Sequence, residues 1–206
     1  MVILLLSGVT YLITTYTSIM ETAVKKRLIN VEEYYRMGET GLIQSHENVE
    51  LINGEIYTMS PIGSRHAAIV DQLADLLKSK LPLKTITRTQ NPIHIDQWNE
   101  PEPDIALVHF REDYYASAHP TATGVLLVVE VSGSSVDFDR TIKLSLYASA
   151  AIPVYWIIDW QKNVIEVMEI PVKDQYTRHS KYHPGDKITF MDIDFDVASI
   201  LLTKPQ

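Results

Sequence analysis

The sequence predicts an α/β fold with a mixed central β-sheet and helices on both of its faces. The main observation is the run VLLVVEV at residues 125–131, which is too short and too rich in β-branched residues for a good helix, and is apolar at both alternating sets of positions. A strand that is buried on both faces has this pattern. The second observation is that strand-like runs alternate with helical patterns along the chain, as they do in α/β domains.

The composition predicts one soluble globular domain. The chain has 206 residues, of which 46% are hydrophobic and 21% charged, and it contains no cysteine. Disulfides, zinc-thiolate sites and thiol nucleophiles are therefore excluded, and the absence fits a reducing compartment, so we expect a cytoplasmic location. The net charge of −8 argues against a broad basic surface for nucleic acid. It leaves room for a nuclease, because metal-binding acids lower the net charge while a local cationic groove holds phosphates.

The first 19 residues are expected to lie outside the domain, which we place at residues 20–206. This stretch is apolar but is interrupted by Ser, Thr and Tyr and has no basic start, so it is a poor membrane span and a poor signal peptide. The composition changes abruptly at Met20, and our hypothesis is that Met20 is the true initiator. The alternative is an N-terminal anchor, although no stable membrane association is expected. A natural peptide spanning Ile19 and Met20 would contradict the hypothesis.

Two local patterns predict the first elements of the domain. Asn30 can cap a short helix, with Glu33 at the position that completes a capping box. Residues 49–59 (VELINGEIYTM) predict a β-hairpin, because Asn53-Gly54 supplies the two positive φ angles of a tight turn between apolar-rich arms.

The middle of the chain predicts a long helix followed by short strands. Ser64 can cap a helix that runs to about Lys80, with an apolar stripe on one side, and Pro82 ends it. The expected elements that follow are strands at 84–90, 92–96 and 101–108, and a loop at 111–124.

After the strand at 125–131, a polar turn leads to a helix that opens near Asp139. Strands at 155–159 and 164–170 are expected to form a second hairpin. The turn at 184–186 leads to a last short strand, and residues 197–202 predict a terminal helical turn.

Two carboxylates in apolar runs predict a metal site. Asp104 lies in PEPDIALV and Glu130 in VLLVVEVS. A carboxylate in a buried strand loses its hydration, which is costly unless a metal or a cation compensates it. Mg²⁺ binds through one or two carboxylates and keeps several waters, one of which can become a nucleophile, and Mn²⁺ is a possible substitute. Asp104 taken alone could simply cap a turn.

The order of these residues resembles a known nuclease family. Pro103-Asp104, then Glu130 in a buried strand, then a helix and another strand resemble the PD-(D/E)XK nuclease superfamily. The chain is similar to the Uma-type restriction endonuclease family of that superfamily. The resemblance spans about residues 30–170 and is carried by VEVS (129–132), DR-x-x-K (139–143), IP-x-YWIID (152–159), VELINGEI (49–56) and Arg65-His66. It implies a restriction-endonuclease-like core and a Mg²⁺-dependent endonuclease acting on DNA, with Asp104 and Glu130 as metal ligands.

The chain departs from the superfamily pattern at Ser132, where a lysine usually follows the acid by two residues. The resemblance implies that the lysine has moved onto the following helix, as Lys143, where it would act in catalysis. Without the resemblance, Lys143 is a solvated helix residue. If it serves the site, Lys143→Ala should abolish cleavage and still leave the fold intact, because a helix tolerates alanine well. Arg140 shares its helix face and either binds a substrate phosphate or pairs with Asp137.

Two further residues are candidates for the catalytic site. Glu50 is an exposed strand acid or, as the resemblance implies, an extra acid that joins the site from an N-terminal element. His66 is a core or capping histidine or a catalytic one.

Three functions remain open from the sequence. The first is the DNA endonuclease, the second a catalytically silent module that binds nucleic acid or a protein, and the third a hydrolase of another phosphate ester. Many nucleases of this type form homodimers, but no residue pattern here identifies such an interface.

Overall fold

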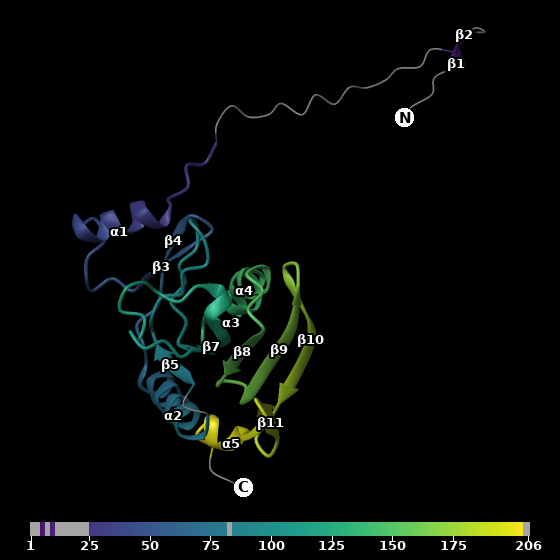
Figure 1. Ribbon diagram of the computed structural model, residues 1–206. Helices are drawn as coiled ribbons and strands as arrows, with labels where there is room; N and C mark the ends of the chain where they lie inside the picture. The colour runs from purple at the N-terminus through teal and green to yellow at the C-terminus, as the bar shows by residue number, and fades with distance from the viewer. Residues whose placement is uncertain (1–4, 7–8, 11–24, 82–83, 204–206) are drawn as a thin grey trace.

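The computed structural model describes residues 5–6, 9–10, 25–81 and 84–203 (Figure 1). Met20 and most of the first 19 residues lie outside this part, so the prediction about the initiator stays open. The elements in chain order are β1 (Leu5–Leu6), β2 (Val9–Thr10), α1 (Val31–Glu39), β3 (Val49–Ile52), β4 (Glu55–Thr58), α2 (Ser64–Lys80), β5 (Thr85–Thr89), β6 (Ile105–His109), the 3-10 helix η1 (Ala122–Gly124), β7 (Val125–Ser132), α3 (Val136–Phe138), the π-helical turn η2 (Asp139–Lys143), α4 (Leu144–Ser149), β8 (Val154–Asp159), β9 (Val164–Val172), β10 (Gln175–Tyr182), β11 (Lys187–Phe190), β12 (Ile193–Asp196) and α5 (Val197–Ile200).

A six-stranded sheet in the order β10-β9-β8-β7-β6-β5 forms the centre of the fold. Strands β7 and β8 are parallel, and the other neighbours in the sheet are antiparallel. The segment α3-η2-α4 makes the crossover that a parallel pair requires. The predicted mixed α/β sheet is therefore confirmed, and β7 lies in its middle, as its two-sided apolar pattern indicated.

Each face of the sheet is covered by helices. On one face, Leu73 and Leu77 of α2 pack in one cluster with Leu127 and Val129 of β7, together with α5. On the other face, Tyr147 of α4 belongs to the cluster that contains alternate residues of β7 and β8. Because side chains of a strand alternate between faces, Glu130 and Ser132 point toward the α4 face.

The N-terminal capping box and hairpin form as predicted. Asn30 accepts a hydrogen bond from the Glu33 backbone N–H at 2.8 Å, and the Glu33 carboxylate accepts one from the Asn30 backbone N–H at 3.1 Å. Asn53 and Gly54 both have positive φ, at 53° and 71°. The Tyr34 hydroxyl of α1 donates to the Val49 carbonyl at 2.9 Å, which ties α1 to the hairpin. Figure 1 shows α1, β3 and β4 grouped at the opposite end of the molecule from α5.

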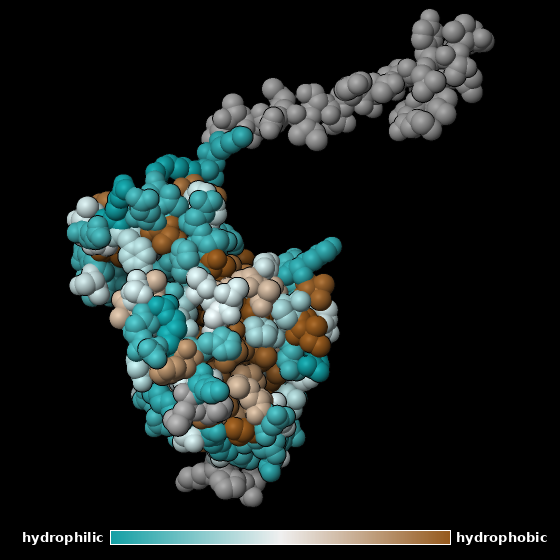
Figure 2. All heavy atoms as spheres, in the orientation of Figure 1, coloured by the Kyte–Doolittle hydropathy of each residue, from teal (hydrophilic) through white to brown (hydrophobic). Residues whose placement is uncertain are grey.

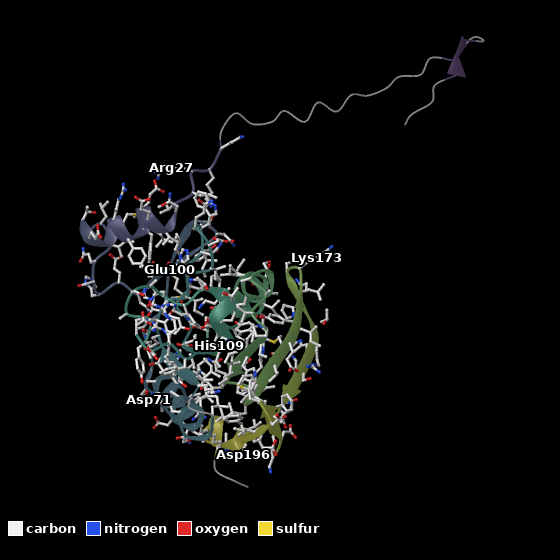
Figure 3. The ribbon with its side chains drawn as sticks, in the orientation of Figure 1. Arg27, Asp71, Glu100, His109, Lys173 and Asp196 are labelled. Carbon is white, nitrogen blue, oxygen red and sulfur yellow. The ribbon has the colours of Figure 1, made fainter. Side chains whose placement is uncertain are left out.

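A buried acid also holds this group together. Glu100, labelled in Figure 3, accepts hydrogen bonds from the Tyr35 hydroxyl of α1 and from His94 Nδ1. The Tyr35 contact positions α1 against the loop that precedes β6. The Glu100 backbone N–H donates to the Leu51 carbonyl of β3 at 2.8 Å, which positions the hairpin against the same loop. The hairpin is therefore part of the folded body, which matters for the site because β3 carries Glu50.

Four expectations about local structure are wrong. The single last strand expected after the turn at 184–186 is a pair of antiparallel strands, β11 and β12. Residues 92–96 form only isolated bridges and no strand, because the Asp96 carboxylate accepts from the Trp98 N–H and makes a turn. The α2 helix is capped by Gly63 without a side-chain bond, and not by Ser64. The helix expected from Asp139 starts at Val136 and contains a π-helical turn.

The sequence did not predict strand β10, because it is an edge strand and has no apolar pattern. Its sequence QYTRHSKY is mostly polar and exposed, as is common at a sheet edge. It pairs with β9 in a hairpin whose tip carries Lys173 (Figure 3).

Hydrophilic residues cover most of the face shown in Figure 2. Among the described residues, no helix has the length and apolar character needed to cross a membrane.

Candidate active site

A cleft of about 940 Å³ opens beside the hairpin, at the end of β7 and the start of α2. Its edge includes Tyr57 of β4, whose ring centroid lies 5.0 Å from that of Phe138 on α3. The ionisable residues that line it are Glu50, Arg65, His66, Glu102, Asp104, Glu130, Asp139 and Lys143. Five of the six residues predicted for the site therefore lie in one cleft.

The centre of the site is a buried network around Glu130. Lys143 Nζ lies 2.9 Å from Glu130 Oε1 and 3.0 Å from Glu50 Oε1, and the Tyr147 hydroxyl donates to Glu130 Oε1 at 2.8 Å. Glu130, Glu50 and Lys143 are 4%, 4% and 2% exposed, so the ammonium is held between two carboxylates away from water. The alternative that Lys143 is a solvated helix residue is therefore wrong, because its side chain is buried in the site.

Burial and charge shift the pKa values in this network. Burial raises the pKa of Glu130 and of Glu50, because a carboxylate without water favours its neutral form. Burial alone would lower the pKa of Lys143, but the negative charges of Glu130 and Glu50 raise it above its ordinary value. The lysine is therefore a fixed positive charge at neutral pH.

Asp104 lies directly beside Glu130. It precedes β6, and its Oδ2 accepts a hydrogen bond at 2.8 Å from the backbone N–H of Val131, the residue after Glu130. Its Oδ1 lies 2.8 Å from Nε2 of His66, in the first turn of α2. Asp104 is thus held by β7 and by α2, and His66 is tied to the acid instead of capping its helix or packing in the core.

The His66–Asp104 contact predicts a pH-dependent stability. The hydrogen bond to Asp104 raises the pKa of His66 above its ordinary value. A folded-state pKa above the unfolded one contributes stability that is complete below the unfolded pKa and is lost as the pH rises through the folded pKa. We expect His66→Gln, which is neutral, to lower the free energy of unfolding relative to wild type by up to about 1 kcal/mol near pH 5.5 and by less near pH 9.

Urea denaturation at the two pH values measures this difference. The exposed His46 lies outside the cleft lining and supplies the control, and His46→Gln should leave the free energy of unfolding close to that of wild type. An equal loss at both pH values for His66→Gln would mean that the contact does not depend on the charge of the imidazole.

Asp139 is a site residue that the sequence did not identify. It is 3% exposed, lines the cleft, and its Oδ2 accepts hydrogen bonds from the hydroxyls of Ser132 at 2.7 Å and Ser135 at 3.0 Å. Burial raises the pKa of Asp139. Ser132, which stands at the usual lysine position, therefore binds an acid of the following turn. The spacing of Asp139 four residues before Lys143 was the available signal.

Arg140 does not line the cleft. Its Nε donates to Glu166 Oε1 at 2.9 Å and its Nη2 to Asp159 Oδ2 at 3.1 Å. The expected alternative, a pair with Asp137, is wrong, because the side chain extends across β8 and β9 instead. We therefore leave Arg140 out of the substrate-binding surface.

One oxygen of the site lacks a donor. Glu50 Oε2 is buried and has no hydrogen-bond partner among the described residues. In the same part of the chain, no three His, Asp or Glu side chains converge as a group that could hold a metal ion. Glu55, the other acid of the hairpin, forms an ion pair with Lys26 at the surface.

Comparisons with known proteins give the family and a solved structure with a similar fold. The model of the Uma2 family, described as "Putative restriction endonuclease", matches residues 31–197. The fold is similar to the crystal structure of "a putative nuclease belonging to DUF820 from Anabaena variabilis ATCC 29413", with a TM-score of 0.65 and 12% identity over 84% of this chain and 98% of that chain. No curated protein matches the chain. Because the family model spans most of its length, the chain belongs to the Uma2 family.

Proposed function

We propose that the protein is a metal-dependent endonuclease that hydrolyses phosphodiester bonds of DNA, with a PD-(D/E)XK site whose lysine is Lys143. The observation that carries the proposal is the position of Glu130, buried on β7 beside Asp104 and bonded to Lys143 in one cleft. The family description supports nuclease chemistry, and the fold of the DUF820 protein supports the same core.

The residues of the cleft fit a hard divalent cation such as Mg²⁺. Asp104 and Glu130 supply adjacent carboxylates, and Glu50 supplies a buried oxygen that lacks a donor. A buried acceptor without a partner is unfavourable, and a cation would satisfy it. Mg²⁺ needs only one or two carboxylates because it keeps its waters, so the absence of a three-residue cluster among the described residues is compatible with it. When bound, the ion lowers the pKa of a water and polarises a phosphoryl oxygen.

The chain's own residues supply the remaining requirements. Lys143 places a permanent positive charge beside Glu130, where it can stabilise the negative charge that develops on the phosphate. Tyr147 fixes the Glu130 carboxylate, and His66 fixes Asp104. Glu50 of the hairpin binds the lysine, which is 2% exposed, and this shielding from bulk water strengthens the charge interactions.

A cleavage assay tests the proposal directly. Supercoiled plasmid and single-stranded DNA are incubated with the protein in Mg²⁺, in Mn²⁺ and in EDTA. Nicking or linearisation that requires the cation supports the proposal. DNA binding without cleavage would instead make the chain a silent nuclease-fold module. Hydrolysis of bis-p-nitrophenyl phosphate without DNA cleavage would point to another phosphate ester.

Metal binding should also raise the thermal stability of the wild type. An ion that binds only the native site shifts the unfolding equilibrium by mass action, by about 2.7 kcal/mol when its concentration is a hundred times its Kd. We therefore expect millimolar Mg²⁺ or Mn²⁺ to raise the Tm of wild type and to leave that of Asp104→Asn nearly unchanged.

The matched control is Asp71→Asn, since Asp71 is an exposed acid of α2 outside the cleft lining (Figure 3). Its Tm should rise with the ion as the wild-type Tm does. Equal shifts in wild type and Asp104→Asn would show that the ion binds elsewhere on the acidic surface.

A further inference from the structure

Lys143, the lysine of the proposed site, lies at the end of an unusual helical segment. Residues Asp139–Lys143 form a π-helical turn between the short helices α3 and α4. Single π-turns inside helices are rare and are often found at functional sites. Such a turn is less regular than an α-helix, so contacts made by its side chains decide where it lies.

Three side chains of this turn bind the same face of the sheet. Asp139 accepts a hydrogen bond from Ser132 of β7 at 2.7 Å, and Lys143 binds Glu130 of β7 at 2.9 Å. Between them, Arg140 donates to Glu166 of β9 at 2.9 Å. The turn is therefore fastened to β7 at both ends and to β9 by its arginine.

The register of the sheet explains how Arg140 and Lys143 work together. Glu130 of β7 pairs with Ile157 of β8, and Ile157 pairs with Glu166 of β9. The two acids are two strands apart, or roughly 10 Å, on one face. Arg140 and Lys143, three residues apart on the turn, each bind one of them and so span Ile157.

Arg140 could serve as the counter-charge of Glu166 or as a tether for the π-turn, and the charges around Glu166 distinguish these two roles. The Glu166 and Asp159 side chains are each 2% exposed, and the planar guanidinium contacts both. From β10, His179 Nε2 lies 2.8 Å and Lys181 Nζ 3.6 Å from Glu166. Without Arg140, Glu166 would still have Lys181 and His179 as partners. The turn would lose its side-chain tether to β9, and its link to β8 would be reduced to the Tyr155 hydroxyl, which donates to the Asp139 carbonyl at 3.1 Å.

We propose that Arg140 is a positioning residue that sets the place of the Lys143 ammonium by fastening the π-turn to Glu166 and Asp159. The inference rests on the proposed nuclease function for its catalytic consequence. The placement of Lys143 itself does not depend on what the cleft hydrolyses.

The kinetic test uses Arg140→Met and Arg140→Lys with plasmid DNA and Mg²⁺. A displaced catalytic group lowers the rate of the chemical step without changing substrate binding, so kcat should fall roughly tenfold to a hundredfold in Arg140→Met while KM stays within about twofold. Lysine restores the charge but cannot bridge two carboxylates, so Arg140→Lys should recover part of the loss.

The matched control is Arg178→Met. Arg178 also belongs to a carboxylate pair on this sheet, with Glu169 of β9, and it contacts no residue of the π-turn. Its kcat and KM should equal those of wild type. A rise in KM for Arg140→Met with unchanged kcat would show that Arg140 binds DNA directly and would overturn the proposal, as would a lower Tm with unchanged kcat and KM.

A second readout is independent of nuclease activity. The ¹⁵N-resolved NMR signal of the buried Lys143 ammonium can be assigned by its loss in Lys143→Met. It should shift or broaden in Arg140→Met and stay in place in Arg178→Met. An unchanged signal in Arg140→Met would overturn the positioning role. If wild type cleaves no DNA under any condition, the proposed function fails, and this spectrum still decides the role of Arg140.

Discussion

Replacing Glu130 with glutamine should reduce DNA cleavage by roughly a thousandfold or more, because the variant loses a charged ligand for the proposed ion. The same change should leave the metal-free fold as stable as wild type or more stable. In the structure two buried carboxylates share one ammonium, and Glu130→Gln leaves Lys143 paired one-to-one with Glu50. Removing a buried charge that lacks its own counter-charge relieves desolvation.

Cleavage assays, calorimetric titration with Mn²⁺ and thermal melts in EDTA measure the three expected effects. Glu112→Gln, a change of an exposed acid on the loop before β7, serves as the control and should match wild type in all of them. A marked fall in the metal-free Tm of Glu130→Gln would mean that the carboxylate serves the fold and not the ion.

Replacing Lys143 with methionine should abolish cleavage and also destabilise the protein. The helical pattern alone suggested that a small residue is tolerated at this position. The structure shows instead that Lys143 is buried between Glu50 and Glu130, so its loss leaves two carboxylates without a counter-charge. Breaking a buried ion pair by removing one partner typically destabilises a protein by about 3–5 kcal/mol.

This loss of stability should depend on pH in a defined direction. Without the ammonium, burial holds the pKa of Glu50 and Glu130 above the unfolded values. A raised carboxylate pKa gives a contribution that is complete below the unfolded pKa and is lost as the pH rises through the folded pKa. Urea denaturation should therefore find the deficit of Lys143→Met small near pH 4 and large near pH 7.

The double variant Lys143→Met with Glu50→Gln gives the matched comparison. It should recover part of the stability at neutral pH, because one unpaired charge is gone, and none of the activity. An equal deficit at both pH values, unaffected by Glu50→Gln, would show that lost packing and not unpaired charge causes the destabilisation.

Local sequence patterns were sufficient to predict the central strand and the N-terminal hairpin. The two-sided apolar run of β7 placed a central strand, and Asn53-Gly54 placed a hairpin turn, because each depends on residues that are neighbours in the sequence. Glu130 could be singled out for the same reason, since an acid inside an apolar strand is costly wherever that strand packs. Asp104 followed from a similar pattern one strand earlier.

The partners of these residues were decided only by the tertiary structure. Lys143 meets Glu50 across 93 residues of sequence, and that contact depends on the hairpin folding against the sheet. Whether Arg140 points to the cleft or to Glu166 depends on a π-turn, and no local sequence pattern predicts that turn. Hydrophobic periodicity reports whether a side chain is buried, whereas the charge that compensates a buried acid is chosen by packing between distant elements. The sequence therefore located Asp104 and Glu130, whereas the fold added Asp139 and determined which cations hold Glu130 and Glu166.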